Sequence, residues 1–154
     1  MNYSQSTRKR IADLVIGMRV DKAANASPLV QDTPLFQIIG GKVMVTFLIG
    51  EVTTVIQTTA TTIRFRFDAD VGSDAYLSGG STDLSAVAVG SQIGITGTAA
   101  GEVLVGNALA PAQAQPIVLS EGYIDVNYGA AATGAIKYSV WYIPLENGAY
   151  IKAA

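Results

Sequence analysis

The sequence contains no cysteine and no histidine among its 154 residues. Without thiols or imidazoles, the chain has no Ser-His-Asp triad, no cysteine nucleophile, no disulfide and no ordinary zinc, iron or copper site. A histidine-based pH switch is excluded for the same reason. The chain is therefore not expected to be an enzyme, and no cofactor is expected.

Charged side chains are also scarce, at 14% of the residues, whereas 49% of the residues are hydrophobic. Soluble domains usually carry roughly 25% charged residues. Such sparse charge indicates that part of the surface is covered, so we predict an oligomer or a subunit of a larger assembly. The net charge of −2 lacks the basic footprint of nucleic-acid-binding proteins, and no nucleic-acid partner is expected.

Long apolar runs are missing as well. No segment reaches 18 apolar residues without a polar interruption, so neither a membrane-spanning helix nor a membrane partner is expected. The basic residues Arg8, Lys9 and Arg10 precede an apolar stretch in the manner of an export signal. Because Asp13 and Arg19 interrupt that stretch, we predict an arm instead.

The charges that are present divide the chain into two parts. Residues 1–42 hold six basic and three acidic residues, whereas residues 43–154 hold four basic and nine acidic residues. A basic arm on an acidic body is typical of arms that dock on a neighbouring subunit. The alternative is a basic terminus that is simply solvated.

Within the arm, four apolar residues fall on one face of a helix: Ile11, Leu14, Val15 and Met18. A strand over residues 14–20 fits the same residues. The following residues, 21–34, are small and polar with two prolines, which predicts a linker. We therefore predict an N-terminal arm and linker over residues 1–34 and a body over residues 35–154.

The body has the pattern of an all-β protein. Apolar and charged residues alternate over residues 63–68, which predicts a half-buried strand. Residues 43–48 are apolar on both faces, which is typical of a strand inside a sandwich or at a subunit interface. Asn147-Gly148 predicts a two-residue hairpin. About nine short strands separated by glycine-rich turns favour an antiparallel β-sandwich or jelly-roll-like body with an extended N-terminal arm.

One acidic segment is a candidate metal site. Asp68, Asp70 and Asp74 supply the carboxylates that Ca²⁺ prefers, and Gly72 would let the loop wrap around an ion. The spacing is not that of an EF-hand, because the position that needs a bidentate glutamate holds Gly79. The alternative is an ordinary solvated acidic loop, and no metal is assigned.

Two segments are candidate subunit interfaces. Residues 52–63 are rich in threonine, low in charge and prone to form strands, so an exposed copy of this segment would aggregate. We predict that Val55 and Ile56 are covered by another subunit. Trp141 and Tyr142 belong to an aromatic C-terminal region that either fills the core, forms an interface or binds sugar.

Two stretches of the body resemble a known family. Residues 32–57 (DTPLFQIIGGKVMVTFLIGEVTTVIQ) and 122–151 (GYIDVNYGAAATGAIKYSVWYIPLENGAYI) are similar to segments of small virion proteins of tailed bacteriophages, including cyanophages. The resemblance is to capsid decoration, or cement, proteins. It covers residues 32–152 and leaves the first 31 residues uncovered.

This resemblance implies a virion structural protein that forms a homotrimer on the outer capsid surface and stabilises the shell. Its partner would be the major capsid protein, and Arg8, Lys9 and Arg10 would belong to a capsid-docking arm. Val55, Ile56, Trp141 and Tyr142 would then lie at the subunit interface. The alternative function is a tail-fibre or other phage surface module that binds carbohydrate or a receptor.

Overall fold

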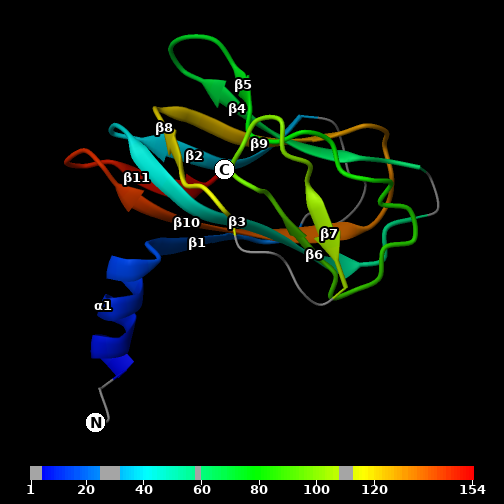
Figure 1. Cartoon of the computed structure of the whole chain (residues 1–154), viewed down its shortest axis with the longest axis horizontal. Coiled ribbons are helices and arrows are strands. Elements are labelled where there is room, and N and C mark those ends of the chain that lie inside the picture. The colour runs from blue at the N-terminus through cyan, green and yellow to red at the C-terminus, as the bar shows by residue number, and fades with distance from the viewer. Residues whose placement is uncertain (1–4, 25–31, 58–59, 108–112) are drawn as a thin grey trace.

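The computed structural model of the chain describes residues 5–24, 32–57, 60–107 and 113–154 (Figure 1). These residues form one helix and eleven strands. In chain order the elements are α1 (Gln5–Val15), β1 (Met18–Lys22), β2 (Thr33–Ile39), β3 (Val43–Thr54), β4 (Ile63–Ala69), β5 (Ala75–Tyr76), β6 (Gln92–Gly94), β7 (Leu104–Gly106), β8 (Ile117–Leu119), β9 (Gly122–Tyr128), β10 (Ala135–Pro144) and β11 (Tyr150–Ala153).

The strands form two antiparallel sheets, which confirms the predicted all-β class. The first sheet has the order β1-β10-β3-β6-β7, with β8 also paired to β3, and the second has the order β11-β2-β9-β4-β5. The sheets face each other across one core. The ring of Phe65 in the second sheet meets that of Tyr138 in the first at 6.0 Å, edge to face.

The alternation expected over residues 63–68 is present in β4. Ile63, Phe65 and Phe67 are buried in the core, and the charged residues between them are only half-buried on the opposite face. Strand β10 directs Ile136, Tyr138, Val140 and Tyr142 into the core, but Ser139 on its other face is also buried. In β4, side chains on alternate faces therefore divide between core and outer surface as their polarity predicts.

Strand β3 departs from simple alternation. Val43 and Val45 are buried as one face, but Phe47 is half-buried and Leu48 lies in the core. The pairing with β10 explains the change, because Tyr142 pairs with Val45 and the preceding Trp141 pairs with Phe47, which leaves Thr46 as an extra residue. Such a bulge reverses the direction in which the following side chains point.

The predicted arm and linker contain residues of both sheets. The helix and the strand that competed for the N-terminal region both form, one after the other, as α1 and β1. Strand β1 pairs with β10 in the first sheet, and β2 begins at Thr33 in the second. The ordered β-structure therefore starts before residue 35, because the edge of β10 offers unpaired backbone groups and Val20 packs against the core. Linker residues 25–31 lie outside the described residues.

The predicted hairpin at Asn147-Gly148 is wrong in one respect. The two residues do form the turn between β10 and β11. However, β11 pairs with β2 in the second sheet and β10 belongs to the first, so the turn crosses between the sheets (Figure 1). Pro144, which cannot donate a backbone hydrogen bond, ends β10 just before this crossing.

Candidate assembly surface

Helix α1 projects away from the β-sandwich (Figure 1). None of its residues is buried, and its apolar side chains are among the most exposed in the described chain: Leu14 is 80% exposed, Val15 is 73% exposed and Ile11 is 47% exposed. An isolated helix of 11 residues is marginal in water. Exposed apolar side chains on such a helix make it a candidate contact surface.

The junction between α1 and β1 fixes the direction of the helix. Gly17 has a φ of +101°, and a Cβ at this position would collide with the backbone carbonyl of Tyr142. The hydroxyl of Thr46 donates a hydrogen bond to the carbonyl of Ile16. A residue with a side chain at position 17 would therefore displace the helix. The helix leaves the body in a direction set by contacts with β3 and β10.

An open recess of about 470 Å³ lies between α1 and the end of β10. We call it the helix groove, and its lining residues are Arg10, Asp13, Leu14, Met18, Ile143 and Pro144. Four of these residues are apolar, so the groove continues the apolar face of α1 onto the body.

In the part of the chain that the structure describes, no helix is long and apolar enough to cross a membrane.

The helix carries a positive charge that the described chain does not neutralise. Lys9 Nζ forms an ion pair with Asp13 Oδ2 at 2.8 Å, one turn further along α1. Neither Arg8 nor Arg10 has an ion pair with any residue that the structure describes. Two positive charges therefore remain beside the apolar face of the helix.

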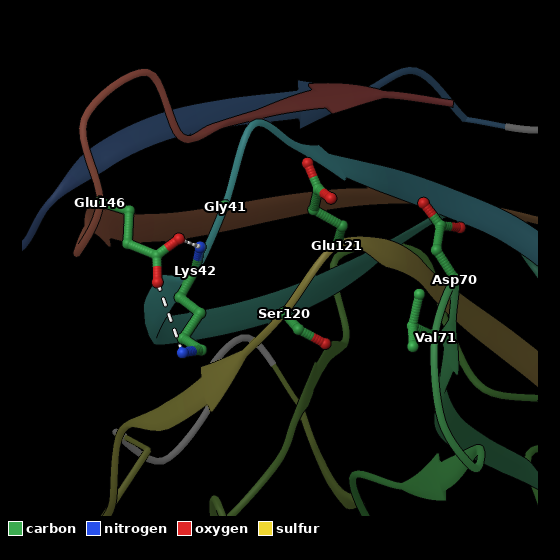
Figure 2. A pocket seen from close by; sticks show the side chains of 7 residues that line it. All are labelled: Gly41, Lys42, Asp70, Val71, Ser120, Glu121 and Glu146. Carbon is green, nitrogen blue, oxygen red and sulfur yellow. Dashed lines mark hydrogen bonds and ion pairs between the residues drawn. The ribbon is translucent and has the colours of Figure 1, made fainter.

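A second groove lies where four connections between strands meet at one end of the sandwich (Figure 2). We call it the loop-end groove; it has a volume of about 210 Å³ and is lined by Gly41, Lys42, Asp70, Val71, Ser120, Glu121 and Glu146. These residues come from the β2–β3, β4–β5, β8–β9 and β10–β11 connections. Segments that are distant in the sequence thus build one surface.

The two sides of the loop-end groove differ in charge. On one side, Lys42 forms an ion pair with Glu146 at 3.4 Å, and its backbone N–H donates to the same carboxylate at 3.1 Å (Figure 2). On the other side lie Asp70 and Glu121, for which the described residues supply no cationic partner. Glu121 accepts a hydrogen bond from the backbone N–H of Gly40 at 2.6 Å. Two negative charges therefore remain uncompensated.

Val71 lies next to these acidic residues. Its side chain is 89% exposed, the highest value among the large apolar residues that are exposed in the described chain. It occupies the turn after β4, between Asp70 and Gly72. A valine contributes to stability when its apolar surface is removed from water, and this one stays in water in the single chain. Its side chain is therefore available for contact with an apolar surface.

The predicted interface residues divide between the surface and the core. Val55 is 49% exposed and Trp141 is half-buried on the outer face of the first sheet. Ile56, which follows the end of β3, and Tyr142, which strand alternation in β10 directs inward, are both buried in the core of the single chain. These two side chains are therefore not accessible to a partner subunit in the single chain. The predicted roles of Val55 and Trp141 stay predictions.

Trp141 has partners on its own sheet. Its ring meets Phe47 edge to face at 5.6 Å, and the guanidinium of Arg19 lies 5.0 Å from the ring centroid. Because Trp141 and Tyr142 are neighbours on a strand, they point to opposite faces and do not form a common aromatic platform.

The three acidic residues of the candidate calcium site do not form one cluster, because Asp68 lies beside Asp74 but Asp70 lines the loop-end groove. Asp74 forms an ion pair with Arg66, which holds the pKa of the Asp74 carboxyl below its ordinary value through a hydrogen bond. Arg66 also lies 3.7 Å from Asp32. Asp70 lines the loop-end groove instead. Within the described ranges, no group of three acidic side chains is arranged to hold a metal ion.

Asp125 on β9 is an unexpectedly buried carboxylate. It is 6% exposed, and its Oδ1 atom has no hydrogen-bond partner among the residues described. Burial, followed by repulsion from Asp68, raises the pKa of Asp125 above its ordinary value. The charge of Arg66, which pairs with Asp125 across the strands, acts in the opposite direction. This carboxylate therefore opposes folding when it is charged.

Sequence reasoning identified the basic and apolar residues of α1 but missed both grooves. The helix groove includes Ile143 and Pro144, and the loop-end groove includes Glu121 and Glu146. These residues become neighbours only through the strand order. The one local signal was Val71, a large apolar residue inside a turn segment of small and acidic residues.

Comparisons of this chain with protein families, with curated proteins and with solved structures find no match. The resemblance of residues 32–152 to decoration proteins therefore remains an expectation from the sequence.

Proposed function

We propose that this chain is a virion structural protein, a capsid decoration protein that forms a homotrimer and stabilises the outer surface of the major capsid shell. The observation that carries the proposal is helix α1, whose apolar face is unpartnered and whose direction is fixed by Gly17. A helix held in this way is prepared to dock on a neighbouring subunit of the assembly. The scarcity of charge in the whole chain supports the same function.

The binding energy of such a protein comes from burial and from repeated contacts. Covering an exposed side chain such as Leu14 or Val15 contributes about 1.5–3 kcal/mol. Arg8 and Arg10 add electrostatic attraction to an acidic surface, which speeds association and weakens with salt. A trimer that engages several capsid sites at once gains affinity without any stronger single contact.

The alternative, a surface module that binds carbohydrate, requires aromatic side chains that share one exposed face. Trp141 is half-buried beneath Arg19, and Tyr142 points into the core. This arrangement favours the decoration protein over the carbohydrate-binding module.

The proposal predicts that the purified protein co-sediments with empty capsids of its virus. In a variant with Ile11→Asp and Val15→Asp, at two exposed residues that do not line the helix groove, the affinity for capsids should fall by about 100-fold, since two apolar contacts of about 1.5 kcal/mol each are lost. Both residues are exposed, so the sandwich should keep its unfolding transition. Sedimentation with capsids over a range of protein concentrations measures the change.

The matched control is Val89→Asp, which places the same charge at a valine that is 59% exposed and lies outside both grooves. This variant should bind capsids like the unmodified protein. Unmodified protein that stays in the supernatant at every concentration contradicts the proposed function.

A further inference from the structure

We infer that the helix groove of one copy receives the loop end of a second copy, with Val71 of the second copy seated on the apolar lining and Asp70 beside Arg10. This inference rests on the assembly role proposed above and names the partner of α1. Each half of the contact lies on the described surface of a single chain. The resulting contact would bring together Arg10 and Asp70, two charges that have no ion pair with the residues that the structure describes.

The shapes of the two surfaces are complementary. The helix groove is a wide recess whose apolar floor is formed by Leu14, Met18 and Ile143. Val71 is a knob on a turn, and almost all of its side chain is accessible. Placing an exposed valine in an apolar recess removes apolar surface from water on both sides of the contact.

The charges of the two surfaces also match. Arg8 and Arg10 leave two positive charges on α1, and Asp70 and Glu121 leave two negative charges beside Val71. Of the two charged residues that line the helix groove, Asp13 is already paired with Lys9, so Arg10 is the one that Asp70 would face when Val71 is seated. Opposite charges around an apolar centre give an interface both its attraction and its register.

Val71 of the same chain does not fill its own helix groove, because Val71 is 89% exposed and no residue of α1 is buried, so the occupant that we infer is Val71 of a second copy. Gly17 and the Thr46–Ile16 hydrogen bond direct α1 away from the sandwich, and no residue of α1 is buried. The knob and the recess are different surfaces, so the contact is heterologous. Heterologous contacts that close by rotation form rings, which fits the proposed homotrimer.

The substitution Val71→Asp tests the apolar part of this contact. Light scattering of the purified protein without capsids should give three times the monomer mass for the unmodified chain. Val71→Asp should raise the concentration at half-assembly by about tenfold or more, since it replaces an apolar contact by a charge. The control Val89→Asp should assemble like the unmodified chain.

A charge exchange tests the polar part. Arg10→Glu alone and Asp70→Lys alone should each weaken assembly by about tenfold, because each places like charges opposite one another. The double variant Arg10→Glu/Asp70→Lys should recover trimers, since attraction is restored with the signs reversed. Both positions lie on the surface of the chain, and circular dichroism checks that each variant is folded.

The outcomes separate this inference from the proposed function. A monomer that binds capsids, a trimer that Val71→Asp leaves unchanged, or a charge exchange without recovery would each overturn the inference. Loss of the trimer in the single variants and its recovery in the double variant support it. These measurements contain no capsids, so failure to bind capsids bears on the proposed function alone.

Discussion

At the scale of single residues, the sandwich is joined by a hydrogen bond between two tyrosine hydroxyls. Tyr128 in β9 and Tyr138 in β10 lie 2.6 Å apart, oxygen to oxygen, inside the core. Burial is the main cause that raises the pKa of Tyr128 from 10.0 to about 12, and burial also raises the pKa of Tyr138 well above its ordinary value. Each hydroxyl satisfies the other, so neither is an unpaired polar group in an apolar core.

These raised pKa values predict that the protein loses stability in strong base. Between pH 10 and pH 12, Tyr128 is ionised in the unfolded chain but protonated in the folded chain. The unfolded state then binds fewer protons, so the free energy of unfolding falls as the pH rises, by about 1.4 kcal/mol per pH unit for each such group. Urea titrations at several alkaline pH values measure the slope.

The double variant Tyr128→Phe/Tyr138→Phe should keep its stability near pH 7, because both partners of the hydrogen bond are removed together. Its slope between pH 10 and pH 12 should be flatter than that of the unmodified protein. Tyr76→Phe, at a residue that is 51% exposed, should keep the original slope. Equal slopes in the double variant and the unmodified protein would show that the tyrosine pair is not the cause.

At the scale of elements, the sequence predicts what each strand does locally but not which strand is its neighbour. Alternation correctly placed the faces of β4, because side-chain direction follows from the period of a strand. The bulge at Thr46 was not visible, since it arises from the register between β3 and β10. The Asn147-Gly148 turn was visible, but its crossing between sheets depends on the pairing of β11 with β2.

The same distinction applies to the candidate site. The apolar face of α1 follows from helical spacing, so sequence reasoning found Ile11, Leu14 and Val15, whereas Met18 of the same predicted face lies in β1. The loop-end groove combines four connections, and only the strand order brings residues such as Asp70 and Glu146 together. Threonine-rich residues 52–63 were predicted to be buried between subunits or inside the sheet, and Ile56, which we assigned to a subunit interface, is covered within the single chain. Two of these residues, 58 and 59, lie outside the described residues.

The junction of α1 and β1 gives a prediction at this scale. Gly17→Ala should lower the free energy of unfolding more than Gly90→Ala does. Both glycines have positive φ values, +101° and +86°, but only at Gly17 would a Cβ meet backbone atoms. The left-handed conformation costs a non-glycine residue about 1–2 kcal/mol, and the collision at Gly17 adds to that cost.

Urea unfolding of the two variants measures this difference, and light scattering measures assembly. Gly17→Ala should also weaken the trimer, because the helix can no longer hold its direction. Gly90→Ala should leave assembly unchanged, since the space around Gly90 is open. Equal losses of stability in the two variants would show that the direction of α1 does not depend on Gly17.

At the scale of the whole molecule, the described chain consists of a β-sandwich with a buried core and a projecting helix without one. The sandwich buries a continuous core between two sheets, whereas α1 has no buried residue. A chain with few charges thus retains exposed apolar side chains mainly on α1 and on turns such as that of Val71. Helix α1 and the turn of Val71 are the two halves of the contact that we infer between copies.

The most direct test of the claim that α1 makes the contact between copies is hydrogen exchange of the α1 backbone in dilute and in assembled protein. Helix α1 alone is marginal in water, so its amides around Leu14 should exchange rapidly in the monomer. In the trimer the same amides should be protected by at least about tenfold, while those of β3 should be protected equally in both states. Equal protection of α1 in monomer and trimer would contradict the claim that this helix is the assembly element.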